Sequence, residues 1–151
     1  PFFCGDEIKR SMNLLSEKNL DFVKPHNESS SGAAILGYSI KTNSLSKLHF
    51  IEDDNLDTEM IDPFLLNIEN CNFDVLTNQI KIPRNIRLTL DYVEDYWLLR
   101  SLIRILGQNP SRKDIYQFFF KNPDFSKINF FKNKDWADKQ ASQIQNQLNL
   151  N

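Results

Sequence analysis

The 151-residue chain has few cysteines, glycines and prolines: it contains two, four and six of them, respectively. The two cysteines, Cys4 and Cys71, permit one disulfide at most, and two lone thiols are more typical of an intracellular protein. The two histidines do not cluster with the cysteines in the sequence, so sulfur-based metal binding is not indicated. A chain of this length can bury a core without disulfides, and we expect one domain over residues 1–151.

The chain also has no large excess of positive or negative charge. The formal net charge is −2, from 18 basic and 20 acidic residues, and the two signs are interspersed along the chain. This balance predicts neither nucleic-acid binding nor attraction to a membrane surface. No apolar run approaches the roughly 18 residues that span a bilayer. The N-terminus also lacks a basic region followed by an apolar stretch, so we expect a cytoplasmic protein.

What the sequence does contain is an alternation of strand-like and helix-like patterns. Apolar residues at helical spacing predict one helix over 6–18 and another over 92–106, which Gly107 ends. Ser111, with Asp114 three residues later, predicts the start of a third helix, and a last helix begins near Asp135. Strands are expected at 20–23, 72–76 and 86–90, short helices at 43–50 and 58–68, and either type at 33–40. This order favours an α/β layered domain.

The most informative segment is 86–95, where a strand-like alternation ends at Asp91 and acids return at Glu94 and Asp95. In α/β sheets, ligands bind beyond the carboxyl ends of the strands, where Asp91 would project. A carboxylate there could hold Mg²⁺, which proteins bind through one or two carboxylates plus substrate phosphate oxygens. Glu94 and Asp95 are expected to stabilise the first turn of the next helix. The alternative is that Asp91 only closes the strand and caps that helix.

The same segment resembles a known family signature. Arg87-Leu-Thr-Leu-Asp91-Tyr-Val-Glu94-Asp95 is similar to the R-L-T-x-D-x-x-E-D segment of cytidylyltransferases of the spore-coat-polysaccharide and acylneuraminate (CMP-nonulosonate synthetase) type. Three further stretches resemble the N-P-x…I-N ending of the spore-coat branch and the family's substrate-side segments: Asn122-Pro123-Asp124 with Ile128-Asn129, Ser31-Gly32 leading into Leu36-Gly37-Tyr38-Ser39, and Thr58-Glu59. The resemblance extends over nearly the whole chain.

This resemblance implies a fold and a function. The fold would be the C-terminal part of a Rossmann-like nucleotide-diphospho-sugar transferase, a three-layer α/β/α structure with C-terminal helices. The function would be transfer of CMP from CTP to an acidic sugar for surface polysaccharide synthesis, by a homodimer that uses Mg²⁺. Asp91 would bind the metal, and Ser31, Gly32, Glu59 and Arg87 would contact the substrate. The resemblance assigns no catalytic residue within this chain.

The beginning of the chain departs from the family pattern. The chain opens with Pro1-Phe2 and no initiator Met, as though cut from something longer, and these residues resemble the end of the family's G-D-x-P-F element. The family's second metal-binding Asp and the loop that grips the CTP phosphates would precede Pro1. We therefore expect the chain to represent the C-terminal two-thirds of such an enzyme and to be inactive alone.

Other interpretations remain open for each residue and for the whole chain. Arg87 is equally compatible with a surface position on a strand, Ser31 and Gly32 with a plain turn, and Glu59 with a helix cap. His26, alone in a polar loop, is expected at the surface. The aromatic-rich stretch 118–136 is typical of an interface, which would suit a non-catalytic module that dimerises or binds a sugar. A third possibility is a sugar nucleotidyltransferase that uses UTP or GTP.

Overall fold

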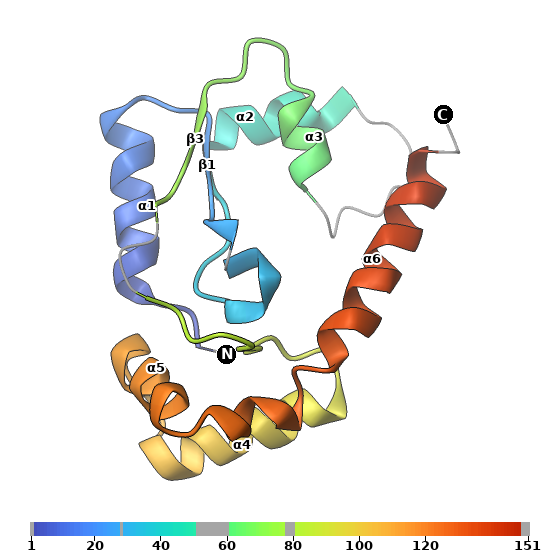
Figure 1. The fold of residues 1–151 in the computed structure, drawn as a ribbon. Helices are drawn as coiled ribbons and strands as arrows, with labels where there is room; N and C mark the ends of the chain where they lie inside the picture. The colour runs from blue at the N-terminus through green and yellow to red at the C-terminus, as the bar shows by residue number, and fades with distance from the viewer. Residues whose placement is uncertain (1, 28, 51–60, 78–80, 149–151) are drawn as a thin grey trace.

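The structure is a computed structural model that describes residues 2–27, 29–50, 61–77 and 81–148; the side chains at 30, 31, 49, 50, 62, 63 and 143–148 lie outside that description. Within these parts the chain is mixed α/β, with a small sheet and a majority of helices (Figure 1). The helices are α1 (Gly5–Glu17), α2 (Thr42–Ser46), α3 (Asp62–Leu66), α4 (Val93–Leu106), α5 (Arg112–Lys121) and α6 (Lys132–Leu148). Shorter turns are the π-helical η1 (Ser29–Ala33) and the 3₁₀ segments η2 (Lys47–Phe50) and η3 (Pro123–Ile128).

The described strands form one three-stranded sheet in the order β2-β1-β3, from β1 (Phe22–Lys24), β2 (Ser39–Ile40) and β3 (Phe73–Val75). The central strand β1 runs antiparallel to β2 and parallel to β3. Phe22 is fully buried, and its ring stacks on that of Phe73 with the ring centroids 4.8 Å apart. The expected strands at 20–23 and 72–76 are thus confirmed within two residues at their ends, and α1 packs beside β1 and β2 (Figure 1).

The expected strand at 86–90 is wrong. The segment is extended but pairs with no strand of the described sheet; instead the Leu88 amide donates to the carbonyl of Gly32 at 2.7 Å. Ile86, Arg87 and Leu88 are all buried, so the period-two alternation of the sequence does not correspond to an inner and an outer face. The ambiguous stretch 33–40 begins at the last residue of η1, has no regular secondary structure over 34–38, and joins the sheet only through its last two residues.

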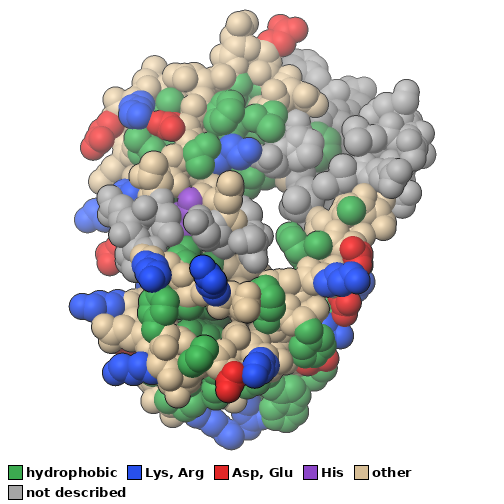
Figure 2. Space-filling model, in the orientation of Figure 1, with side chains coloured by type: hydrophobic (Ala, Val, Ile, Leu, Met, Phe, Trp, Pro, Cys, Tyr) green, Lys and Arg blue, Asp and Glu red, His purple; other side chains and the backbone are tan. Residues whose placement is uncertain are grey.

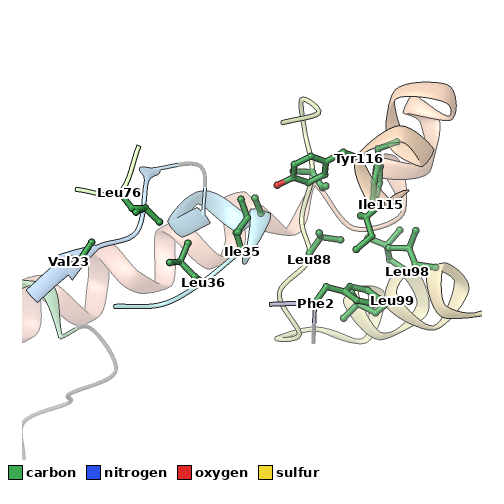
Figure 3. Close-up of a cluster of buried hydrophobic side chains, with 14 of the residues drawn as sticks. Phe2, Val23, Ile35, Leu36, Leu76, Leu88, Leu98, Leu99, Ile115 and Tyr116 are labelled. Atoms are coloured by element: carbon green, nitrogen blue, oxygen red, sulfur yellow. The ribbon is translucent and has the colours of Figure 1, made fainter. Parts of the chain in front are cut away.

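The hydrophobic core joins this extended segment to two C-terminal helices. Leu98, Leu99 and Leu102 form the buried face of α4, and Ile115 lies on the buried face of α5. Leu88 lies among these side chains, close to Phe2 from the N-terminal end (Figure 3). Burial of Ile86 and Leu88 in this core holds the extended segment against the helices without a strand partner.

Local sequence signals account for the ends of α4 and α5. The Ser111 hydroxyl accepts a hydrogen bond from the Asp114 amide at 3.1 Å, which confirms the expected start of α5. Gly107 ends α4 as expected: its φ of 94° lies in a region that L side chains rarely adopt, and its amide donates to the Ile103 carbonyl. The last helix begins at Lys132, three residues before the expected start. None of the described helices has both the length and the apolar character needed to cross a membrane.

Candidate functional site

A buried ion pair lies at the start of α4. Arg87 and Asp95 are 1% and 0% exposed, and the guanidinium Nε and Nη2 atoms donate to Asp95 Oδ1 and Oδ2 at 2.9 and 3.0 Å. Asn129 Nδ2 donates both to Asp95 Oδ1, at 2.8 Å, and to the Arg87 carbonyl, at 2.9 Å. Two fully buried charges are tolerated only when they are paired and hydrogen-bonded, and here they are.

Asp95 also accepts hydrogen bonds from backbone amides at the start of α4. Its Oδ2 accepts from the backbone amides of Asp91 and Tyr92, which lie at the helix start and have no partner within the helix. Burial pushes the pKa of Asp95 upward, but the hydrogen bonds from Arg87, Asn129 and these two amides outweigh burial and hold the pKa below its ordinary value. The expectation that Asp95 stabilises the helix start is therefore confirmed, although its pairing with Arg87 was not foreseen.

Asp91 lies at the exposed end of this network. Its Oδ2 accepts from Arg87 Nη2 at 2.6 Å, while its side chain is 41% exposed. It borders an open cavity of about 560 Å³ between the start of α4 and α6, whose described lining consists of Asp91, Tyr92, Trp136, Asp138, Lys139, Gln140 and Ser142. Asp91 thus keeps an exposed carboxylate beside a cavity, with one oxygen held by a buried arginine.

A second open cavity is also lined by Trp136. It has a volume of about 690 Å³ and lies between the segment 81–86 and α6, with Arg84, Phe130 and Asn133 among the residues that line it. Figure 2 shows the molecule hollowed between α6 and the part that carries the sheet. Trp136 is the described α6 residue that lines both cavities, so α6 borders each of them.

The other residues expected to bind substrate have different positions. Gly32, in the η1 turn, has φ 116°, and a Cβ at this position would lie 3.3 Å from the Ile86 carbonyl oxygen and 3.4 Å from Asn133 Oδ1. Asn133 Oδ1 itself accepts from Arg87 Nη1, so Gly32 packs directly behind the ion pair. The Ser31 side chain and the whole of Glu59 lie outside the described residues.

The surface position considered for Arg87 is wrong. The guanidinium is fully buried, and its Nε, Nη1 and Nη2 atoms all donate to protein oxygens. A substrate contact by Arg87 stays a prediction, and in this arrangement Arg87 would act through the Asp91 carboxylate that it orients. The structure therefore brings Arg87, Asp91 and Gly32 close together. Of these three residues, only Asp91 lines the cavity between the start of α4 and α6.

The expectation of a surface position for His26 is also wrong, because its side chain is 4% exposed. Its Nδ1 accepts from the Ser29 amide at 3.3 Å. The buried Ser29 hydroxyl in turn accepts from the amides of Ile35 and Leu36. The polar loop therefore folds inward as a hydrogen-bonded turn. The polar composition of this loop predicted that it would be exposed. The prediction failed because the sequence does not show which backbone amides the side chains of His26 and Ser29 will bind.

Sequence reasoning did not single out the α6 side chains that line the cavities. Trp136 was expected on the apolar side of the last helix, but Lys139 and Gln140 lie in a polar stretch that resembles any solvated helix surface. Among the described residues, no group of three His, Cys, Asp or Glu side chains is placed to hold a metal ion. No protein-family model, curated protein or solved structure matches the chain.

Proposed function

We propose that the chain is the C-terminal portion of a cytidylyltransferase that activates an acidic sugar as its CMP derivative for surface polysaccharide synthesis. One observation carries this proposal: Arg87, Asp91, Asp95 and Asn129, all quoted in the resemblance to that family, belong to one hydrogen-bonded network beside an open cavity. The segments that contain them are separated by more than 30 residues in sequence, so their convergence is a property of the fold.

The residues at this site fit Mg²⁺ only as an ion shared with a substrate. Arg87 binds Asp91 Oδ2, which leaves the other carboxylate oxygen, Oδ1, for a ligand. A single carboxylate with phosphate oxygens and water is a common way for proteins to bind Mg²⁺. The site does not resemble a cage made by protein ligands alone, since the described residues offer no cluster of three. Bound Mg²⁺ would neutralise phosphate charge.

In the proposed reaction, a hydroxyl of the acidic sugar attacks the α-phosphorus of CTP. The new phosphorus–oxygen bond forms as the bond to the β-phosphate oxygen breaks, the hydroxyl proton is released, and pyrophosphate leaves. This chain would contribute mainly by positioning and by charge stabilisation. Arg87 fixes the orientation of Asp91, and Asp95 with Asn129 fixes Arg87. No described side chain is assigned as the base that accepts the proton.

The Rossmann-like fold is part of the same proposal. Its support is the parallel pairing of β1 with β3, which requires a crossover connection of the kind found in such sheets. A complete layer of this kind would contain more strands than the three of the described sheet.

Pyrophosphate release tests this function. The chain itself and the full translation product of its gene are incubated with Mg²⁺, a nonulosonic acid, and CTP, UTP or GTP. We expect release from CTP by the full product, and we expect Asp91→Asn to reduce it by about 100-fold or more, the scale of losing a charge-stabilising group at a reacting phosphate. Asp124→Asn, at an 86%-exposed side chain, is the matched control and should keep full activity. Equal rates for Asp91→Asn and the unaltered protein would refute the assignment.

The second candidate function is a non-catalytic module that dimerises. The outer face of α4 exposes four large apolar side chains, Val93, Tyr96, Trp97 and Ile103, at helical spacing. A second copy of the chain suits this face because Glu94 lies at one end of α4 and Arg104 at the other. Two α4 helices packed antiparallel about a two-fold axis would therefore place unlike charges opposite each other.

Sedimentation analysis over a range of protein concentrations tests this alternative. We expect a dimer that Trp97→Lys converts to monomer. Met12→Lys provides the control, because Met12 is equally exposed but lies on α1. A protein that is monomeric at every concentration would rule out α4 as a homodimer interface, whereas a dimer without any nucleotidyltransferase activity would favour the non-catalytic module over the enzyme.

A further inference from the structure

Two open cavities border one short segment of the chain, residues 81–85. The first is the cavity of about 690 Å³ described above, and the second has a volume of about 380 Å³. Residues 81–85 line both of them. Ile86, Phe130 and α6 complete the described lining of the larger cavity, and α5 and η3 complete that of the smaller one. The two cavities and the segment that they share are called the 81–85 groove below.

The shared segment is anchored by its apolar residues and exposes its basic ones. Pro83 is buried and Ile82 packs half-buried against the hydrophobic core, whereas Lys81 and Arg84 are both exposed. Within the described part of the chain, no carboxylate forms an ion pair with either cation; Lys81 has only a ring contact, with its ammonium group 5.9 Å from the centre of the Phe120 ring. The described lining of both cavities also contains no Asp or Glu. The groove therefore presents positive charge that its own walls do not neutralise.

The remaining walls supply aromatic surface. In the smaller cavity, Phe119 is 2% exposed and its ring packs edge-on against that of Phe125, with the centroids 6.5 Å apart, while Phe120 is 48% exposed. In the larger cavity, Phe130 and Trp136 are both half-buried. An apolar group that entered either cavity would remove aromatic surface from water, which is favourable.

The charge and shape of the groove favour one kind of occupant. A small molecule would fill one cavity, whereas an extended peptide that crosses the segment 81–85 can place side chains in both, since alternate residues of such a chain lie about 7 Å apart. Carboxylates of the peptide would complement the two cations where it crosses. Nucleic acid suits the groove less well, because two cations neutralise few phosphates and the whole chain carries a net charge of −2.

We propose that the 81–85 groove is a docking site for an acidic peptide segment of a partner protein. Lys81 and Arg84 bind the carboxylates of the peptide, and the apolar side chains that flank these carboxylates enter the two cavities. Asn85 borders both cavities with an exposed side chain that forms no hydrogen bond within the described residues, and it bonds the peptide backbone. This docking site does not depend on the proposed enzymatic function.

Fluorescence anisotropy of labelled peptides, titrated with the whole chain at physiological ionic strength, tests the docking site. The probes are fluorescein-labelled Gly-X-Asp-Glu-X-Gly peptides in which X is Phe, Trp, Leu or Ile. Gly-X-Asn-Gln-X-Gly and Gly-Ala-Asp-Glu-Ala-Gly are the matched controls. We expect saturable binding of at least one acidic peptide with a large apolar X, and binding about tenfold or more weaker for both controls, the scale of one charge-assisted hydrogen bond or one buried side chain. No saturable binding of any acidic peptide, or equal binding of either control, would overturn the proposal.

Matched variants locate the peptide on the groove. Lys81→Ala and Arg84→Ala should each weaken the acidic peptide about tenfold, whereas Lys121→Ala, at an exposed lysine outside both described linings, should leave its affinity unchanged. Phe120→Ala should weaken peptides with a large X, and Phe131→Ala, at a 57%-exposed ring that also lies outside both described linings, should not. Circular dichroism and the unfolding midpoint show that each variant is folded. Unchanged affinity in both Lys81→Ala and Arg84→Ala would contradict the proposed site.

Two competitors distinguish the peptide from other anions. Single-stranded oligothymidylate and, separately, CTP with Mg²⁺ are added to the peptide complex, and we expect the peptide to stay bound in both cases. Displacement by oligothymidylate would assign the groove to nucleic acid, and displacement by CTP would assign it to the nucleotide of the proposed enzyme; either result overturns the peptide site. Peptide binding without pyrophosphate release by the full translation product would support the docking site and overturn the enzyme, and the reverse result would overturn the docking site alone.

Discussion

Arg87 holds Asp95 side-on through two hydrogen bonds of 2.9 and 3.0 Å, and both side chains are removed from solvent. The pair joins an extended segment to the first turn of α4, and Asn129 from the end of η3 completes it. Since neither charge can be hydrated in the folded protein, each depends on the other. This mutual dependence leads directly to the first two predictions.

Removal of either partner should destabilise the fold strongly. We expect Arg87→Ala to lower the free energy of unfolding by about 3–5 kcal/mol, because it leaves Asp95 buried without its counter-ion. The same change at the exposed pair of Lys127 and Asp124, Lys127→Ala, should cost about 1 kcal/mol or less. Urea denaturation followed by circular dichroism measures both. Similar losses for the two variants would mean that the buried pair does not stabilise the fold as its geometry indicates.

The pair should also make stability depend on pH in the acid range. The pKa of Asp95 is lowered in the folded protein, so its contribution is present above the unfolded value of about 3.9 and is lost as the pH falls through the folded value. Asp95→Asn should therefore be less stable than the unaltered protein at neutral pH, and this difference should shrink as the pH falls below about 4. Asp21 and Asp74, whose pKa values are also lowered, are present in both proteins and cancel in the comparison. A difference that stays constant from pH 7 to pH 2 would contradict the prediction.

Gly32 should not tolerate a side chain. Its φ of 116° is unfavourable for any L residue, and a Cβ would approach the Ile86 carbonyl to 3.3 Å. We expect Gly32→Ala to cost about 1–3 kcal/mol of stability. Gly5→Ala is the control, because nothing lies within 4 Å of the Cβ position there and Gly5 starts a helix. Thermal unfolding should show a lower midpoint for the first variant and an unchanged or higher one for the second.

The cap of α5 should contribute measurably to stability. Ser111 accepts from the Asp114 amide, so Ser111→Ala is expected to cost about 1 kcal/mol. Ser101 donates to the Trp97 carbonyl inside α4, where alanine is the better helix former. Ser101→Ala should accordingly be neutral or slightly stabilising in the same denaturation assay. A loss of stability for Ser111→Ala without a loss for Ser101→Ala would show that the Ser111 cap stabilises α5. Equal losses of stability for the two variants would argue against this contribution.

The helices could be predicted from the sequence because their signals are local. The spacing of apolar residues and the Ser111 and Gly107 boundaries determine α4 and α5 with no knowledge of the rest of the fold. The segment 86–90 could not be predicted in this way. Its alternating pattern is typical of a strand, but the Arg87 side chain is turned inward to partners that include Asn133, 46 residues further along the chain.

The candidate site was predictable only in part, for the same reason. Asp91 could be singled out because it follows an apolar run and precedes a helix, and it does lie beside a cavity. Lys139 and Gln140 could not, since a polar helix surface does not reveal which of its residues will face another segment. The position of His26 was missed because its burial depends on a turn that Ser29 organises through backbone amides.

The position of Asn129 has a mechanical consequence. It is bonded to the ion pair three residues before α6 begins, so the pair anchors the base of a helix that is 17 residues, or about 25 Å, long. A change of a few degrees in the tilt of such a helix would displace its far end by about 1–2 Å, which is comparable to the difference between a hydrogen bond and a broken one. Substitutions at the buried pair would therefore be felt along the α6 wall of both cavities, at a distance from the substituted residue.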